Sequence, residues 1–447
     1  MRVLGRRLEL GPSCNHGVGR PVRYKSVLFE AGKASAGGSQ TPSRQVAVRL
    51  PYLGSKRVRS MSYAIREVVE HARKLEKRGH RVIKLNIGDP VKFGFGTPQH
   101  IKDAFIRAIE DGSSGYSDSE GIPPLLEAVS RSERENGIDV TPENVVATTG
   151  VTEGLEMLLA AALDESSEIL VPGPSYPAYI EYAKLFGARP VAYRKLESEG
   201  WRPDIDDVRE KITPRTRCLI VCSPNNPTGA LYTRSDMKSI MDLAGENDLF
   251  VISDEIYDRI IYEGEMVRPA ALNKDVPTVI VNGLSKVYLS PGWRVGYIAF
   301  HDPEGAISDI REGVLKQARA RLCANTVAQY GLLAALEGPK DHIREMCEAL
   351  KPRRDLATKM INEIGGLSVS KPRGAFYMFP RIDPEVSGDD KQFVLDVLEN
   401  CHVLLVHGSG FHERYGAGHF RLVFLPPEDI LGEALDRIGR YVSGLTG

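Results

Sequence analysis

Short apolar segments alternate with helical patterns along residues 98–300, and this alternation restricts most strongly what the chain can fold into. Strands are expected at residues 145–148, 168–171, 217–223, 249–253, 278–281 and 295–300. When helices separate successive strands, the strands usually run parallel in one sheet. The pattern therefore predicts an α/β fold with a mostly parallel central sheet covered by helices.

Polar residues follow three of the expected strands. The segment RCLIVCS runs into a turn that contains Asn226, LFVISDEIYD reaches Asp254 after its apolar stretch, and TVIVNG ends just before Lys286. Open α/β sheets bind ligands at the edge where their strands end. We therefore expect these three side chains to share one site.

Lys286 stands in the segment NGLSKVYLSPGWRVGY, residues 282–297, with no acidic residue within ten positions on either side. A buried ammonium without a partner is costly, whereas a desolvated lysine amine can form a Schiff base with an aldehyde. With an aspartate that pairs with a pyridinium nitrogen, such a lysine is what a protein contributes to pyridoxal-phosphate chemistry. Taken by itself, the segment also fits a surface loop with a solvated lysine.

The motifs SPNNPTG, SDEIYD and LSKVYLSPGWRVGY, in this order, resemble the class I and II aminotransferases of the fold-type I pyridoxal-phosphate family. The resemblance covers roughly residues 60–447. Within the family, the segments YAIREVV, LNIGDPVKFGF, GYSDSEG and KPRGAFYMFP are most similar to bacterial and archaeal alanine (glutamate–pyruvate) transaminases. The resemblance implies pyridoxal 5′-phosphate as cofactor and a ping-pong exchange of the amino group between alanine and 2-oxoglutarate, giving pyruvate and glutamate.

The resemblance also implies which residues hold the cofactor ring. Lys286 matches the lysine that carries the cofactor and moves the substrate proton, and Asp254 matches the partner of the ring nitrogen. Asn226 and Tyr257 match the groups that hydrogen-bond the 3′ oxygen, although an asparagine here is also ordinary turn chemistry. Tyr176 matches the aromatic residue that stacks on the ring, and a core tyrosine is its structural alternative.

A helix that begins near residue 151 is expected to bind the phosphate group, because helix N-termini offer N–H donors and a positive dipole end. The positions that match the family's phosphate-binding turn are Gly150, Val151 and Thr152. Arg294 adds a charged partner, and Tyr116 matches a tyrosine that reaches the phosphate from the other subunit of a homodimer. The family commonly has a hydroxyl residue where this chain has Gly283, so Ser285 is a candidate replacement.

Substrate binding is assigned to a second set of residues. Arg421, an arginine within the apolar segment HFRLVFL, matches the residue that binds the α-carboxylate, and the backbone of Gly88 matches a donor to the same group. The resemblance also places Asn226 among the substrate-binding residues. Tyr63 and Arg66 match residues at the pocket mouth, where Arg66 could bind the second carboxylate of glutamate or 2-oxoglutarate. A solvated helix arginine is the alternative for Arg66.

The chain divides by composition and pattern. Residues 1–58 are basic, with two acidic residues, and are expected to be a disordered tail, a start-site artefact or a transit peptide. A small domain is expected from residues 59–97 and 340–447, with a helix over 61–77 and a late strand at FRLVFL. The large cofactor-binding domain is expected over residues 98–339.

The composition limits the remaining functional classes. The formal net charge is −1, which gives no indication of nucleic-acid binding, and no apolar run is long enough to span a membrane. Six scattered cysteines without a metal-like spacing suggest a cytoplasmic protein without a metal site. An aspartate or broad-specificity aminotransferase and a carbon–sulfur lyase remain alternatives. A transcription regulator would need a helix-turn-helix segment, which residues 1–58 do not suggest.

Overall fold

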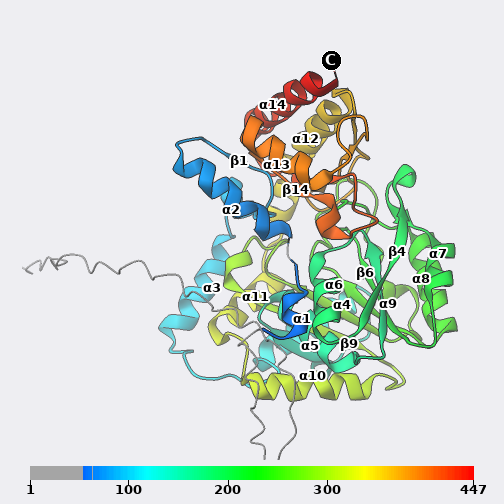
Figure 1. Cartoon of the computed structure of the whole chain (residues 1–447). Helices are drawn as coiled ribbons and strands as arrows, with labels where there is room; N and C mark the ends of the chain where they lie inside the picture. Colours follow the sequence, from blue (N-terminus) through cyan, green and yellow to red (C-terminus); the bar gives the residue numbers. More distant parts are fainter. Residues whose placement is uncertain (1–53, 63, 447) are drawn as a thin grey trace, which may run out of the picture. The chain divides into compact units, whose positions relative to one another are not determined.

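An eight-stranded sheet forms the centre of the computed structural model, which describes residues 54–62 and 64–446 (Figure 1). Its strands are β2 (Val145–Thr148), β3 (Glu168–Gly173), β4 (Arg189–Leu196), β5 (Arg202–Pro203), β6 (Thr216–Cys222), β7 (Phe250–Asp254), β8 (Thr278–Gly283) and β9 (Gly296–His301). They lie in the order β2-β9-β8-β7-β6-β3-β4-β5. The six strands expected from the sequence are therefore confirmed.

The pairing of the strands confirms a mostly parallel sheet. Strands β4, β3, β6, β7 and β8 are parallel neighbours, whereas β5, β9 and β2 join the sheet by antiparallel pairing. Cys222 at the end of β6 pairs with Asp254 at the end of β7, and Asp254 pairs with Val281 of β8. The ends of these three strands thus meet at one edge.

Both faces of the sheet are buried, as expected for a parallel sheet. Alternate residues of β6 belong to two different hydrophobic clusters: Ile220 packs with one cluster, and Leu219 and Val221 pack with the other. Helix α5 (Gly150–Ala162) packs on β8 and β9, and helix α8 (Arg234–Glu246) packs on β7. The continuous apolar strands are explained by this burial on two sides.

Further helices surround the sheet. They are α3 (Gln99–Glu110), α4 (Pro123–Glu135), α6 (Pro177–Leu185), α7 (Ile205–Lys211), α9 (Pro269–Leu272), α10 (Ser308–Arg321) and α11 (Thr326–Glu337). Short 3-10 helices are η1 (Pro90–Phe93), η2 (Pro142–Asn144), η3 (Glu197–Glu199), η4 (Pro291–Trp293) and η5 (Gly408–Phe411). Figure 1 shows α7 and α8 on one side of the sheet and α5, α4 and α11 on the other.

The two ends of the described chain contribute small sheets and the remaining helices. These elements are α1 (Lys56–Arg59), α2 (Ala64–Lys77), β1 (Ile83–Lys84), α12 (Asp341–Glu363), β10 (Leu367–Ser368), β11 (Tyr377–Met378), β12 (Arg381–Ile382), α13 (Asp390–Cys401), β13 (Val403–Leu404), β14 (Val406–His407), β15 (Phe420–Val423) and α14 (Glu428–Thr446). Strand β1 pairs with β13, and β15 lies between β11 and β14. The predicted helix and late strand are α2 and β15, while the domain boundaries remain a prediction.

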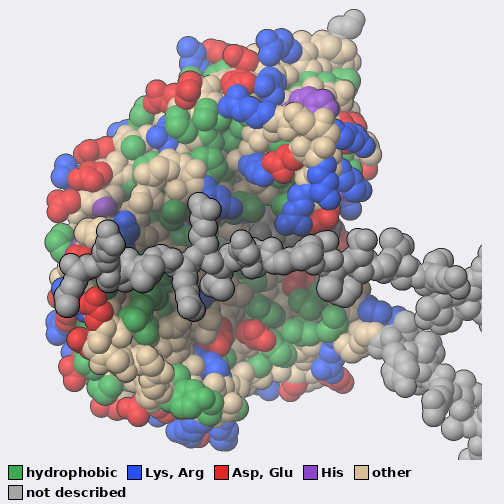
Figure 2. Space-filling view, turned by 90° about the vertical axis from the view of Figure 1, so that its left-hand side faces the viewer, with side chains coloured by type: hydrophobic (Ala, Val, Ile, Leu, Met, Phe, Trp, Pro, Cys, Tyr) green, Lys and Arg blue, Asp and Glu red, His purple; other side chains and the backbone are tan. Residues whose placement is uncertain are grey.

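Most of the predicted tail, residues 1–53, lies outside the described residues. The last part of the predicted tail is described, and α1 begins there after Ser55, whose side chain accepts a hydrogen bond from the backbone N–H of Val58. Within the described ranges, no helix has the length and apolar character needed to cross a membrane. Lys and Arg side chains are intermixed with Asp and Glu on the face shown in Figure 2.

Candidate active site

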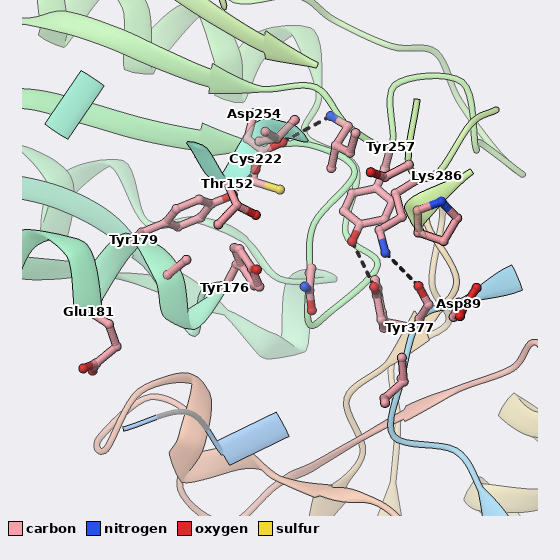
Figure 3. Close-up of a pocket in the computed structure, with 18 of the residues that line it drawn as sticks. Asp89, Thr152, Tyr176, Tyr179, Glu181, Cys222, Asp254, Tyr257, Lys286 and Tyr377 are labelled. Atoms are coloured by element: carbon pink, nitrogen blue, oxygen red, sulfur yellow. Dashed lines mark hydrogen bonds between the residues drawn. The ribbon is translucent and has the colours of Figure 1, made fainter. Parts of the chain in front are cut away.

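The residues predicted from the strand ends lie around one cavity of about 640 Å³ (Figure 3). Those that line it are Gly88, Val151, Thr152, Tyr176, Asn226, Asp254, Tyr257, Ser285, Lys286, Arg294 and Arg421. The ends of β6, β7 and β8 provide Asn226, Asp254 and Lys286, as the strand pattern predicts. Segments from both ends of the chain complete the wall.

Lys286 follows β8 in a turn that directs its amine across the cavity. Its Nζ donates a hydrogen bond of 2.7 Å to the carbonyl oxygen of Gly88. Burial lowers the pKa of Lys286 to about 8; Asp89 opposes this shift, and the charges of Arg421 and Arg294 add to it. A larger share of the amine is therefore neutral near physiological pH than in a free lysine, which favours nucleophilic and proton-transfer chemistry.

Asp254 ends β7 with a buried carboxyl group, 4% exposed. The hydroxyl of Tyr179 donates to its Oδ2 at 2.6 Å, and the backbone N–H of Ile256 donates to its Oδ1 at 3.2 Å. Burial raises the pKa of Asp254 to about 6 despite these donors. The site thus holds a carboxylate that a cationic ligand would stabilise in its charged form.

Arg421 and Asn226 are fixed against each other. The Nη1 of Arg421, on β15, donates to the Oδ1 of Asn226 at 2.9 Å, and Nη2 donates to the carbonyl oxygen of Asn86. Because the amide oxygen of Asn226 is bonded to a cation, its Nδ2 is left as the donor for a ligand. The guanidinium also lies over the rings of Tyr377 and Phe411, at 4.6 and 4.8 Å.

Tyr257 and Tyr377 form a pair beside Arg421. Their hydroxyl oxygens are 2.9 Å apart, and their rings meet edge to face (Figure 3). Gly88 must be a glycine here, because a Cβ at this position would collide with the Tyr377 hydroxyl. The hydrogen bond between Lys286 and Gly88 therefore requires the loop that contains Gly88 to lie close to the Tyr257–Tyr377 pair.

The N-terminus of α5 and Arg294 form a cradle for an anion. Gly150 begins the helix with φ +74°, and a Cβ there would lie 2.6 Å from Nη2 of Arg294. Nη1 of Arg294 donates to Ser285 Oγ at 3.4 Å and to the carbonyl oxygen of Pro291 at 3.0 Å. A helix N-terminus, the Thr152 side chain and a guanidinium together suit a phosphate group.

Comparison with known proteins agrees with this geometry. The family model described as "Aminotransferase class I and II" matches residues 80–438. The chain belongs to the class I and II aminotransferases. Aminotransferases of this family use pyridoxal phosphate, and their substrates are amino acids and 2-oxo acids.

Individual relatives of this aminotransferase are similar along nearly their whole length. Alanine aminotransferase from Mycobacterium tuberculosis is 40% identical over 87% of this chain and 92% of its own. Glutamate-pyruvate aminotransferase AlaA from Escherichia coli is 38% identical over 88% of this chain and 98% of its own. The solved structure of alanine aminotransferase from Pyrococcus furiosus is 54% identical, with a TM-score of 0.86, and covers 88% of this chain and all of that one.

The residues of this aminotransferase fit pyridoxal phosphate at each of its functional groups. The anion cradle suits the phosphate, the buried Asp254 suits a protonated ring nitrogen, and the amide of Asn226 suits the 3′ oxygen. The amine of Lys286 is within the same cavity for the aldehyde. When bound, the cofactor supplies the electron-withdrawing ring that stabilises negative charge at a substrate α carbon.

Close packing of two strands explains why this chain has Gly283 where the family commonly has a hydroxyl residue. Gly283 pairs with Gly296 of β9, and a Cβ at position 283 would lie 2.7 Å from the Gly296 Cα and from the Val295 carbonyl oxygen. A hydroxyl residue at 283 would therefore force β8 and β9 apart. Ser285 lines the cavity within hydrogen-bond reach of Arg294, so it is our candidate for the missing hydroxyl.

The structure does not place three predicted site residues, Tyr116, Tyr63 and Arg66, in the cavity wall. The side chain of Tyr116 is 82% exposed and does not line the cavity of this chain. Tyr63 lies outside the described residues, and Arg66 falls in α2, where its side chain is not described. The roles of these three residues stay predictions.

Sequence reasoning missed several residues of the cavity wall, among them Tyr179, Tyr377 and Glu181. Tyr176 is the N-cap of α6 and Tyr179 lies in its first turn, three positions later, so the nearness of the two tyrosines in the sequence is a signal that could have found Tyr179. Tyr377 is brought to the site by pairing of β11 with β15. No local pattern indicates that pairing.

Proposed function

We propose that the chain exchanges the amino group between alanine and 2-oxoglutarate, giving pyruvate and glutamate. The observation that carries the choice of substrates is the 54% identity to Pyrococcus furiosus alanine aminotransferase over that enzyme's full length. The relatives from Mycobacterium tuberculosis and Escherichia coli carry names of the same activity. A solved double mutant of Thermus thermophilus aspartate aminotransferase is 34% identical with a TM-score of 0.80, which supports the same reaction type with another substrate.

In this proposal the sheet edge and the α5 N-terminus hold the cofactor. Lys286 would bind the aldehyde carbon, and Asp254 would pair with the ring nitrogen. The hydroxyl of Tyr179 orients the Asp254 carboxylate by donating a hydrogen bond to its Oδ2. Tyr176, at the N-terminus of α6, would cover one face of the ring. Val151, Thr152 and Arg294 would donate to the phosphate group. Each role uses a group that already lines the cavity.

Proton transfer is assigned to the amine of Lys286. With a substrate amine in its place, the Nζ would take the proton from the substrate α carbon and could give it to the former aldehyde carbon of the cofactor. The hydrogen bond to the Gly88 carbonyl would hold the free amine over this region. A pKa of about 8 suits this role, because the neutral amine is the base and the ammonium is the acid.

Arg421 is assigned to the α-carboxylate that every substrate carries. Its planar guanidinium can form two parallel hydrogen bonds with a carboxylate. It is 1% exposed and is oriented by Asn226 and by the rings of Tyr377 and Phe411. Arg66, with Tyr63, is proposed to meet the distal carboxylate of glutamate and 2-oxoglutarate, and alanine would leave Arg66 in water.

We also propose a homodimer in which Tyr116 reaches the phosphate of the partner's site. Its 82% exposed ring, with exposed Ile106 and Ile109 on α3, supports a contact surface near this segment. Mixing the variants Lys286→Ala and Tyr116→Ala should create hybrid dimers with one native site and higher activity than either parent. No gain after demonstrated subunit exchange would contradict the shared site.

A panel of amino donors and 2-oxo acid acceptors tests the choice of substrates. We expect kcat/KM for alanine with 2-oxoglutarate to exceed that for aspartate at least about tenfold, which corresponds to about 1.4 kcal/mol of transition-state discrimination. A preference for aspartate would overturn the substrate assignment but keep the reaction type. Turnover of cysteine-like substrates without any acceptor would favour a carbon–sulfur lyase instead.

A further inference from the structure

Lys195, near the end of β4, is a buried lysine that has no part in the proposed transamination. Its side chain is 4% exposed, and it shares a face of the strand with the buried Tyr193. Its Nζ donates a hydrogen bond of 2.8 Å to Oδ1 of Asn225 and lies 5.9 Å from the centre of the Trp201 ring. No carboxylate among the described residues lies within 4.0 Å of this amine.

A lysine buried in this way destabilises the folded state. A buried ammonium with a neutral acceptor loses its hydration without a full countercharge, and an apolar side chain of similar length would pack without that loss. Burial lowers the pKa of Lys195 to about 7. Positions that weaken the fold in this way are expected where function requires them.

The acceptor of Lys195 explains what the lysine does. Asn225 Oδ1 also accepts from the hydroxyl and the backbone N–H of Thr228, at 2.9 and 3.3 Å, while Nδ2 donates to the carbonyl oxygen of Cys222. The backbone of Asn225 bonds to Ala230 and Gly229 as well. Asn225 therefore closes the turn that follows β6, and the lysine adds a third donor to the amide oxygen that Thr228 also binds.

The next residue in this turn is Asn226. Two consecutive asparagines thus each accept a hydrogen bond on their side-chain oxygen from a buried basic side chain, Asn225 from Lys195 on β4 and Asn226 from Arg421 on β15. Lys195 lies outside the cavity lining, and Arg421 is part of it. The turn is held from both sides, which fixes the direction in which the Asn226 amide donates.

We propose that Lys195 is a positioning residue for the cofactor: through Asn225 it holds the turn that presents the Asn226 amide to the 3′ oxygen. This inference rests on the proposed role of Asn226 in cofactor binding. Lys195 does not touch the cofactor cavity itself, so it acts only through the turn. Its loss should loosen cofactor binding without weakening the fold.

The test uses Lys195→Met in the full chain, with three measurements. We expect the apparent Kd of the cofactor-free protein for pyridoxal phosphate, followed by tryptophan fluorescence, to rise about tenfold or more. The pH midpoint of the bound cofactor's absorbance change should move upward, because a weakened donor stabilises the anionic 3′ oxygen less. The Tm of the cofactor-free protein should stay equal or rise, because a buried charge is removed.

Three control variants make the outcome decisive. Lys238→Met removes an exposed lysine that pairs with Asp242 on α8, and it should change none of the three measurements. Asn226→Ala should raise the Kd by itself; if it does not, the proposed role of Asn226 fails and the inference for Lys195 fails with it, whereas a raised Kd here beside an unchanged Kd for Lys195→Met refutes the Lys195 role alone. Lys195→Gln is one atom shorter than the lysine and should show a smaller loss in the same direction, and it decides the question if the methionine variant does not fold.

Two results would overturn the proposal. Wild-type Kd and pH midpoint in the Lys195 variants, beside a raised Kd for Asn226→Ala, would leave the lysine without a positioning role. A Tm that falls by several degrees in the cofactor-free Lys195→Met protein would assign the lysine to stability instead.

Discussion

The inner and outer walls of the active-site cavity are built from different kinds of structure. The inner wall consists of the ends of β6, β7 and β8, and its residues Asn226 and Asp254 are each 4% exposed. The outer wall includes Met61, which is 37% exposed, and Glu181, whose carboxylate accepts a hydrogen bond of 3.0 Å from the backbone N–H of Ser62. The inner wall is part of a sheet core, whereas the outer wall is a contact between separate segments.

We expect this difference to separate the residues that carry out the chemistry from the residues that set substrate specificity. The groups that we propose to act on the cofactor lie at the end of β7 or in the short turns that follow β6 and β8, and the packed sheet holds them within narrow limits, as catalytic geometry requires. Arg66, which we propose to meet the substrate side chain, falls on α2 outside the sheet core, where changes are tolerated more easily. We expect variants of the inner wall to abolish or strongly reduce the reaction with every substrate, and variants of the outer wall to change substrate preference.

The largest effect is expected for Lys286→Ala. Loss of the amine removes both the cofactor attachment and the proton-transfer group, so turnover should fall by at least about ten-thousandfold, the upper range for a lost acid–base group. Steady-state kinetics and the visible absorbance of the protein-bound cofactor measure this. Lys238→Ala, on the surface, should leave both unchanged, and substantial turnover in the Lys286 variant would break the assignment of the inner wall.

A reduction of about a hundredfold or more in kcat is expected for Asp254→Asn, because an amide offers no charge to keep the ring nitrogen protonated. Single-turnover kinetics with alanine is the suitable measurement. Asp258→Asn is a matched control, because Asp258 is equally buried but pairs with Arg268. That control should lose stability rather than chemistry, and near-native single-turnover rates in the Asp254 variant would contradict its role.

Variants of Arg421 and Arg66 test whether the two parts of the cavity wall differ in substrate specificity. Arg421→Ala should reduce kcat/KM for alanine and glutamate alike, roughly tenfold or more, because both carry an α-carboxylate. Arg66→Ala should reduce kcat/KM for glutamate and 2-oxoglutarate by a similar factor while sparing alanine and pyruvate. Arg354→Ala, which removes a buried arginine paired with Glu263, controls for destabilisation. Equal losses for all substrates in the Arg66 variant would contradict a role in binding the second carboxylate and leave Arg66 as a solvated helix arginine.

The smallest effect is a change in the pH dependence of cofactor capture. The pKa of Lys286 is lowered to about 8, so the neutral amine that attacks the aldehyde accumulates as the pH rises through 8 rather than through the range of a free lysine. The rate at which cofactor-free protein binds pyridoxal phosphate should rise with pH and level off above about 8 to 9. Stopped-flow absorbance measures this, and a rate that still climbs steeply at pH 10 would contradict a lowered pKa.

Residues of the inner wall could be predicted from the sequence because their signals are local. An apolar strand followed by a polar residue predicts its own position at the sheet edge, as Asp254 and Lys286 illustrate. Tyr377 and the pairing of its hydroxyl with that of Tyr257 could not be predicted this way, since the two lie 120 positions apart and meet through the packing of β11. The steric reason for Gly283 likewise depends on how closely β9 approaches.

Reduction with sodium borohydride tests the central claim most directly. The hydride fixes pyridoxal phosphate covalently to the lysine that carries it, and peptide mass spectrometry then identifies the lysine. We predict a single modified residue, Lys286, in the wild-type protein and no modified residue in Lys286→Ala. A label on any other lysine, including the buried Lys195, or a label that persists in the Lys286 variant, would contradict the account.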